Sequence, residues 1–183
     1  MKGMIRLALS GLLAATALLT VAGSAPAQTR HDSNAPIDVS ANAIELQDKQ
    51  RRAVFTGGAV FRQATMTLNA DRVTINYTGQ VTEGSPQATR IDVAGNVVLT
   101  RPDQTARSRF AVYDVKARVV TMIGNVRLTQ GANTLNGGRL SIDLDTGRAT
   151  IDGSGVGGSG TPGAPVTQGN GRVTGRFSAP PRN

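Results

Sequence analysis

The side chains that enzymes use as nucleophiles, proton carriers and metal ligands are scarce in this sequence. His31 is the only histidine among the 183 residues, it precedes the part of the chain where strands are expected, and there is no cysteine. Nucleophilic sites of the Ser-His-Asp and Cys-His kinds therefore cannot be assembled, and neither can a metal site built from histidine and cysteine. We expect no catalytic residue, no metal and no cofactor.

One acidic run is similar to the start of a calcium-binding loop: Asp143-Leu144-Asp145-Thr146-Gly147. The later glutamate ligand of such a loop is lacking, so a strand that enters a turn explains the run better. The other acidic residues are scattered over turns and polar faces, and they form no identifiable pair for glycosidase chemistry. These residues predict a protein that is not an enzyme.

Three arginines occupy places that we predict to be equivalent in a repeated pattern. Arg72, Arg109 and Arg139 each precede an apolar residue that is expected to face inward, so they should point to the outer face of a sheet. A guanidinium is well shaped to bind phosphates or sugar acids, which makes the three arginines candidates for polar ligand contacts. The alternative, which we favour, is that they are solvated charges that keep the surface soluble.

The first 27 residues have the three parts of a secretory signal peptide. Lys2 and Arg6 are basic, residues 7–21 are apolar, and Ala25-Pro26-Ala27 provides the cleavage pattern. We predict that residues 1–27 are removed and that the mature chain begins at Gln28. The alternative is an uncleaved membrane anchor, but the apolar run is shorter than the about 20 residues that a spanning helix needs.

The two segments that flank the central part of the chain differ from it in composition. We predict a flexible leader at residues 28–35, one folded domain at 36–153, and a disordered tail at 154–183 that is rich in glycine and proline. Such a tail cannot bury enough apolar surface to offset the entropy of ordering it.

The net charge restricts the kind of partner. It is +8 for the whole chain, and loss of Lys2 and Arg6 with the signal peptide leaves +6. A basic protein suits an anionic partner such as a phosphorylated glycolipid, a membrane surface or nucleic acid. Export and an aromatic content of 3% disfavour nucleic acid, because base stacking needs aromatic platforms.

Glycines recur at nearly constant spacing and predict a repeat. Gly58, Gly95, Gly124 and Gly153 each follow a short β-like run, at separations of 37, 29 and 29 residues. The longer first interval contains an insertion at 80–87 that is typical of an enlarged turn. A further element of each unit aligns residues 41–46, 70–75, 107–112 and 137–142, which gives about three and a half repeats.

Apolar and polar residues alternate within the units, which predicts half-buried strands. Examples are Val73, Ile75 and Tyr77 in one segment. Turn residues follow at intervals of roughly ten residues, a pattern typical of an antiparallel sandwich, barrel or β-solenoid. We expect the glycines to mark bends or bulges where the chain crosses between sheets.

The repeats resemble the OstA/LptA-like family of lipopolysaccharide-transport proteins. The residues that carry the resemblance are Gly95-Asn96-Val97, Gly124-Asn125-Val126, Ala41-Asn42 with Ile44 and Leu46, Ala70-Asp71-Arg72-Val73 with Ile75, and the opening segment Pro36 to Ala41. The resemblance implies an all-β fold, an antiparallel β-jellyroll of two sheets in a slightly open V. The chain departs from the family in its glycine-rich tail and in Arg62, which aligns with Leu99 and Leu128.

The resemblance also implies a periplasmic carrier that shelters the acyl chains of lipid A between two sheets. Each buried methylene contributes about 0.8 kcal/mol, so even part of one acyl chain would give substantial affinity. Arg72, Arg109 and Arg139 would then be the candidate headgroup contacts. For any single apolar residue, membership of an ordinary core is the favoured alternative. The predicted cleft residues are Val39, Ile44, Leu46, Phe55, Val60, Met66, Leu68, Val73, Ile75, Val93, Val97, Leu99, Phe110, Val112, Met122, Val126, Leu128, Leu140 and Ile142.

The partners implied by the resemblance are lipopolysaccharide, a jellyroll component of an inner-membrane transporter and an outer-membrane barrel. Copies would associate edge to edge by strand addition, and we expect the unpaired strands near residues 37–41 and 149–152. Two alternatives remain: a membrane-anchored relative of the same machine, and a self-assembling β-scaffold with a solid core and no ligand. A polysaccharide-binding module is disfavoured because exposed aromatic platforms are not found.

Overall fold

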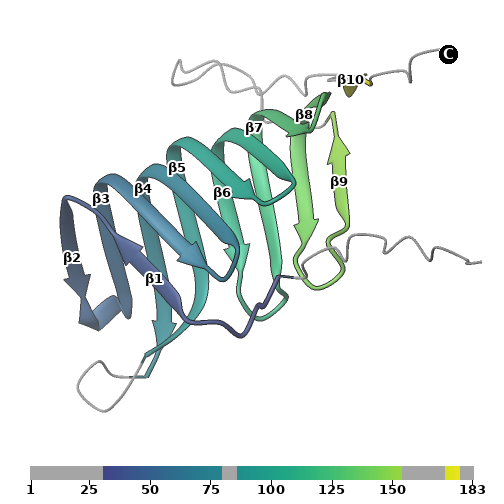
Figure 1. The fold of residues 1–183 in the computed structure, drawn as a ribbon. Helices are drawn as coiled ribbons and strands as arrows, with labels where there is room; N and C mark the ends of the chain where they lie inside the picture. Colours follow the sequence, from purple (N-terminus) through teal and green to yellow (C-terminus); the bar gives the residue numbers. More distant parts are fainter. Residues whose placement is uncertain (1–30, 80–85, 154–171, 178–183) are drawn as a thin grey trace, which may run out of the picture.

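The computed structural model describes residues 31–79, 86–153 and 172–177, and the fold in these residues is all-β, as predicted. All strands join one antiparallel sheet with the main order β1-β3-β4-β5-β6-β7-β8-β10, in which β2 also pairs with β3 and β9 with β8 (Figure 1). A single turn of 3-10 helix, η1 (Asp48–Gln50), joins β2 to β3. The strands are β1 (Ile37–Ser40), β2 (Ala43–Gln47), β3 (Arg52–Gln63), β4 (Met66–Thr78), β5 (Gln87–Arg101), β6 (Gln104–Asp114), β7 (Val119–Gln130), β8 (Asn133–Asp143), β9 (Ala149–Asp152) and β10 (Thr174–Arg176).

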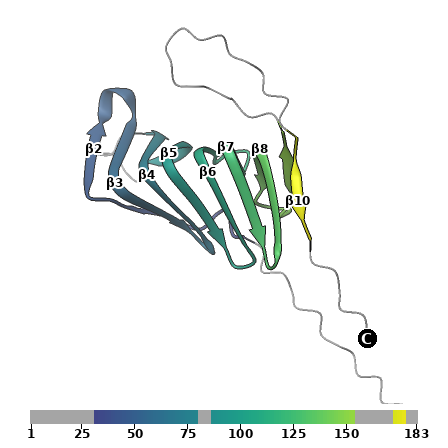
Figure 2. The same ribbon diagram turned by 90° about the horizontal axis from the view of Figure 1, so that it is seen from above.

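The sheet folds over on itself into two layers, because each long strand bends near its middle (Figures 1 and 2). The first layer contains β2, residues 52–56, 72–78, 87–94, 110–114, 119–123 and 139–143, and β9. The second layer contains β1, residues 59–63, 66–69, 97–101, 104–108, 126–130 and 133–137, and β10. The layers are thus continuous through the bends and open at both ends.

Pairs of residues with positive φ produce the bends. Gly95 (φ 81°) and Asn96 (φ 48°) interrupt the register between β5 and β6, and Gly124 (φ 86°) and Asn125 (φ 52°) do so between β7 and β8. Glycine adopts this conformation without strain, and asparagine tolerates it better than most residues. The predicted role of these glycines as bulges between sheets is confirmed.

The first repeat has a different alignment from the one predicted. The register between β3 and β4 is interrupted at Gly57 and Gly58, so Gly57, not Gly58, is equivalent to Gly95 and Gly124. Phe61 therefore stands in the place of Leu99 and Leu128, and the alignment of Arg62 with those leucines was wrong. Two adjacent glycines both fit the pattern, and the sequence does not distinguish them.

The third repeat is also displaced by one residue. Phe110 pairs with Ala94 and Ile123, so it holds the place that Arg72 and Arg139 hold on their own strands. Arg109 lies within the interrupted register one residue earlier, opposite Gly124. The predicted equivalence of the three arginines was therefore wrong for Arg109.

The core lies between the two layers. Phe61 of the second layer makes an edge-to-face contact with Tyr113 of the first, with ring centroids 6.2 Å apart. One hydrophobic cluster contains buried residues from all strands from β3 to β8. Since both layers contribute to one core, burial of apolar surface holds the folded-over sheet together.

Described residues of the predicted leader and tail contact the domain. Residues 31–35, expected to be a flexible leader, pack on the second layer, where the Nε2 of Gln63 donates hydrogen bonds to the carbonyl oxygens of Ser33 and Ala35, both at 3.0 Å. In the predicted tail, β10 adds a strand beside β8. The predicted signal peptide, the loop at 80–85 and residues 154–171 and 178–183 lie outside the described residues.

Candidate functional site

Most of the predicted cleft residues form the closed centre of the molecule. Each of them is buried, with at most 6% of its surface exposed, so they cover one another between the layers. The centre therefore has the character of an ordinary core, the alternative that was favoured for single residues. These residues are Met66, Leu68, Val73, Val93, Val97, Leu99, Met122, Val126, Leu128, Leu140 and Ile142.

The inner apolar face continues to an exposed rim at the β2 end. Ile44 pairs with Phe55 and Leu46 pairs with Ala53, so the two side chains lie on the inner face of the first layer. They are 63% and 50% exposed, because β2 is an edge strand that has only β3 as its neighbour. The predicted residues Val39, Phe55 and Ile75 are partly buried against the core behind this rim. We call Ile44 and Leu46 the N-terminal rim.

A second rim, which the sequence did not predict, lies at the β10 end. A Cβ atom on Gly175 would lie 2.6 Å from the Cδ2 of Leu135 and 3.0 Å from the Cε2 of Phe177, so these residues are close neighbours. Leu135 packs against the core, whereas Val173 and Phe177 are 41% and 67% exposed. We call Val173 and Phe177 the C-terminal rim.

Three predicted cleft residues lie on the outer surface instead. Val60 lies between Ala59 and Phe61, which are both 1% exposed, so its own side chain must point outward. Phe110 and Val112 likewise alternate with the buried residues Ala111 and Tyr113. These assignments were wrong because a shift of one residue at a bulge moves every later side chain to the other face.

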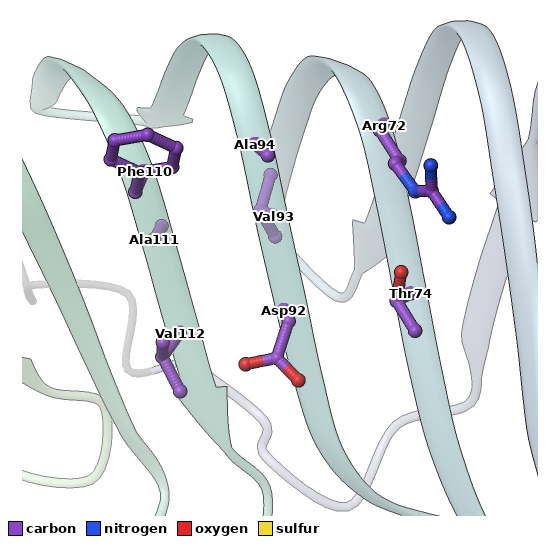
Figure 3. Close-up of a pocket in the computed structure, with 8 residues that line it drawn as sticks. All are labelled: Arg72, Thr74, Asp92, Val93, Ala94, Phe110, Ala111 and Val112. Carbon is purple, nitrogen blue, oxygen red and sulfur yellow. The ribbon is translucent and has the colours of Figure 1, made fainter. Parts of the chain in front are cut away.

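The outer face of the first layer carries a shallow pocket of about 260 Å³ over β4, β5 and β6 (Figure 3). Its side chains form two rows across the strands, Arg72-Ala94-Phe110 and Thr74-Asp92-Val112. The pocket is lined by Arg72, Thr74, Asp92, Val93, Ala94, Phe110, Ala111 and Val112.

The three candidate headgroup arginines are not brought together. Arg72 lines the outer pocket, and the guanidinium of Arg109 lies 5.9 Å from the centre of the Phe110 ring. Arg139 is on β8, and three strands separate it from Arg72, which corresponds to roughly 19 Å. All three are exposed. Their position agrees with the favoured alternative of solvated surface charges.

Polar groups from both layers and from the leader form a buried cluster around Gln63. Its Oε1 accepts a hydrogen bond from the hydroxyl of Tyr113 at 2.9 Å and lies 3.4 Å from the Nε2 of His31. Burial lowers the pKa of His31 and raises the pKa of the Tyr113 hydroxyl, so both side chains favour their neutral forms. The only histidine therefore helps to attach the leader to the domain.

The acidic run after β8 is a turn, as the sequence predicted. The Oδ1 of Asp143 accepts hydrogen bonds from the amides of Thr146 and Asp145 at 2.9 and 3.0 Å, and these bonds lower the pKa of its carboxyl group. Asp145 forms an ion pair with Arg118 at 3.0 Å. The described residues contain no group of three or more His, Cys, Asp or Glu side chains that could hold a metal ion.

Within residues 31–79, 86–153 and 172–177, no helix is long and apolar enough to span a membrane.

The sequence is similar to a known protein family and to a bacterial protein. A family model described as LptA/(LptD N-terminal domain) LPS transport protein matches residues 38–148. A protein of Rhizobium meliloti (strain 1021), described as uncharacterized, is 33% identical over 157 residues, which cover 81% of this chain and 84% of that protein.

The fold is also similar to a crystal structure of LptH from Pseudomonas aeruginosa. That protein is described as the LptA-homologous periplasmic component of the lipopolysaccharide transport device. The TM-score is 0.64 at 22% identity, and the match covers 81% of this chain and 99% of that one. The likeness confirms the predicted OstA-like β-jellyroll. With most of its length matched by the family model, the chain belongs to the LptA and LptD N-terminal domain family of lipopolysaccharide transport proteins.

Proposed function

We propose that this protein is a periplasmic carrier that binds lipopolysaccharide through its acyl chains and passes it from the inner to the outer membrane. The partners would be a jellyroll component of an inner-membrane transporter, an outer-membrane barrel, and further copies of the chain. The family match supports the transport role of this chain. The description of LptH as a periplasmic component supports a periplasmic location.

The observation that carries the proposal is the continuity of the inner apolar face with exposed rims at both ends. Ile44 and Leu46 leave apolar surface open at one end, and Val173 and Phe177 leave it open at the other. Apolar side chains that a protein leaves exposed in groups mark surfaces for a ligand or a partner. Acyl chains would first contact such a rim.

The buried centre restricts how an acyl chain could pass between the two layers. Side chains such as Met122 and Leu140 are fully buried, so an acyl chain can pass them only if the two layers move apart. Each layer is held to the other by apolar contacts across the core and by the strands that continue through the bends. Burial of the lipid would offset the loss of core contacts, since both bury apolar surface.

The same closed centre favours a second candidate, the self-assembling β-scaffold without a ligand. A scaffold needs the open edges and the filled core, and it needs no lipid. The two functions differ in whether lipopolysaccharide contacts the inner rim in the cell.

Photo-crosslinking in living cells distinguishes the two candidates. A photoreactive residue in place of Leu46 should capture lipopolysaccharide, while the same residue in place of Phe110 should capture little. The two positions are a matched pair, because they are 50% and 49% exposed but lie on the inner and outer faces. Equal capture at both positions, or capture at neither, would contradict the carrier function.

A further inference from the structure

The two layers are continuous with each other along one side of the molecule only. On that side lie the bends, which contain Gly95 and Gly124. On the opposite side, strands of the first layer end in the turns at 115–118 and 144–148, and strands of the second layer end in turns such as 102–103. No described strand joins the two layers there, and we call this side the mouth.

The leader residues 31–35 cross the mouth and bond to the turns of the first layer. In Figure 1 this segment runs from β1 beneath the strands toward the turn between β8 and β9. The Oγ of Ser33 donates a hydrogen bond to the Oδ1 of Asp145 at 3.2 Å. The Nη2 of Arg118 donates a hydrogen bond to the Oδ1 of Asn34 at 3.0 Å. The leader is therefore attached to two turns of the first layer.

The same leader residues are attached to the second layer through Gln63. The side-chain amide of Gln63, the last residue of β3, donates the two hydrogen bonds to leader carbonyl oxygens that are described above. His31 is only 5% exposed, and its Nε2 lies 3.4 Å from the Oε1 of Gln63. The layers therefore cannot move apart at the mouth unless the leader detaches from one of them.

The surroundings of His31 oppose its protonation. The charged groups that act on it are Arg101 at the end of β5, Asp32 of the leader and Asp145 of the turn after β8. Burial is the largest effect and lowers the pKa of His31; Arg101 lowers it further, and the contact with Gln63 and the two carboxylates oppose the change only in part. The buried Nδ1 of His31 has no hydrogen-bond partner among the described residues. A proton on His31 should therefore weaken the attachment of the leader.

We propose that residues 31–35 are a strap that keeps the mouth closed, that acyl chains reach the buried centre after this strap is released, and that protonation of His31 favours its release. The bends hold the layers together on one side, so the mouth is the side on which they can separate. The role of the strap toward acyl chains rests on the proposed function, whereas its hold on the mouth does not.

Thiol labelling measures opening of the mouth without lipid, because the chain has no cysteine of its own. Val120→Cys reports on the mouth, since Val120 is fully buried and follows the first-layer turn at 115–118. Ala59→Cys reports on the bend, since Ala59 is 1% exposed and directly follows Gly58. Each labelling rate is divided by that of the exposed reference Ala117→Cys at the same pH.

A change of pH from 7.5 to 5.5 should raise the relative labelling of Val120→Cys about two- to tenfold. Labelling of Ala59→Cys should stay the same, and His31→Gln should remove the pH effect. At pH 7.5, the double variant Ser33→Ala, Asn34→Ala should raise labelling of Val120→Cys about three- to tenfold, because the strap loses its hydrogen bonds to the first layer. Ser40→Ala is the control.

Three labelling results would overturn the strap. They are no rise at Val120→Cys in the double variant, an equal rise at Ala59→Cys, which would mean that the whole domain unfolds, and a pH effect that persists in His31→Gln.

Photo-crosslinking in cells tests the route of the acyl chains. The photoreactive residue p-azidophenylalanine in place of Phe61, which is 1% exposed between the layers, should capture more lipopolysaccharide in the double variant than in the otherwise unchanged chain. No gain at Phe61 with capture at Leu46 intact would refute the strap as a barrier to acyl chains. No capture at Leu46 would instead refute the proposed function, and the labelling results would still decide whether the strap holds the mouth.

Discussion

At the scale of single residues, side chains that look reactive in the sequence have structural roles. Asp143 accepts the amides of a turn, and His31 is buried beside Gln63. The sequence predicted the first role, because the acidic run stands where a strand ends. It did not predict the second, since the contact joins residues that are 32 positions apart.

The buried His31 should make the stability of the domain depend on pH. Burial holds its pKa below 6.5 in the folded protein, so the unfolded chain binds a proton that the folded one resists. Stability is therefore fully present above pH 6.5 and falls as the pH drops below it, by no more than about 1.4 kcal/mol at pH 5.5. Urea unfolding at pH 7.5 and 5.5 measures the difference.

The control for this prediction is His31→Gln, which removes the only histidine. Its stability should change little between the two pH values, because carboxyl groups titrate mainly below this window. An equally large loss in the variant would assign the effect to other groups.

At the scale of elements, the strands and their bends could be predicted, but the faces of some strands could not. Alternation identifies an inward face only as long as the register is unbroken. At Gly57 and Gly58 two residues of β3 stand opposite one residue of β4, a shift of one that places Val60 outside. The displacement near Arg109 likewise places Phe110 and Val112 outside. The bends were found because glycine is the residue that positive φ favours.

Two phenylalanines test the corrected faces. Phe61 is 1% exposed and packs on Tyr113, so Phe61→Ala should cost about 3–5 kcal/mol of unfolding free energy. Phe110 is half exposed on the outer face, so Phe110→Ala should cost less than about 1 kcal/mol. Chemical denaturation of the two variants compares the same substitution on the two faces, and similar losses would contradict the register.

At the scale of the whole molecule, the sequence repeats predicted the fold class correctly. The strands expected at the edges of the sheet, β1 and β9, do lie at its edges. The edge strand β2 was aligned with the interior strands, and β10 was missed because a three-residue strand after a long glycine-rich segment has no periodicity to detect. Likewise, alternation does not show whether the space between two layers is filled, and here the centre is closed.

The central claim is that the protein recognises the acyl part of the glycolipid. The most direct test is equilibrium binding of the purified mature chain to intact and to fully deacylated lipopolysaccharide, which share their sugars and phosphates. Since each buried methylene contributes about 0.8 kcal/mol, removal of the acyl chains should weaken binding at least about a hundredfold. Equal affinity for the two forms, or no saturable binding of the intact lipid, would contradict the account.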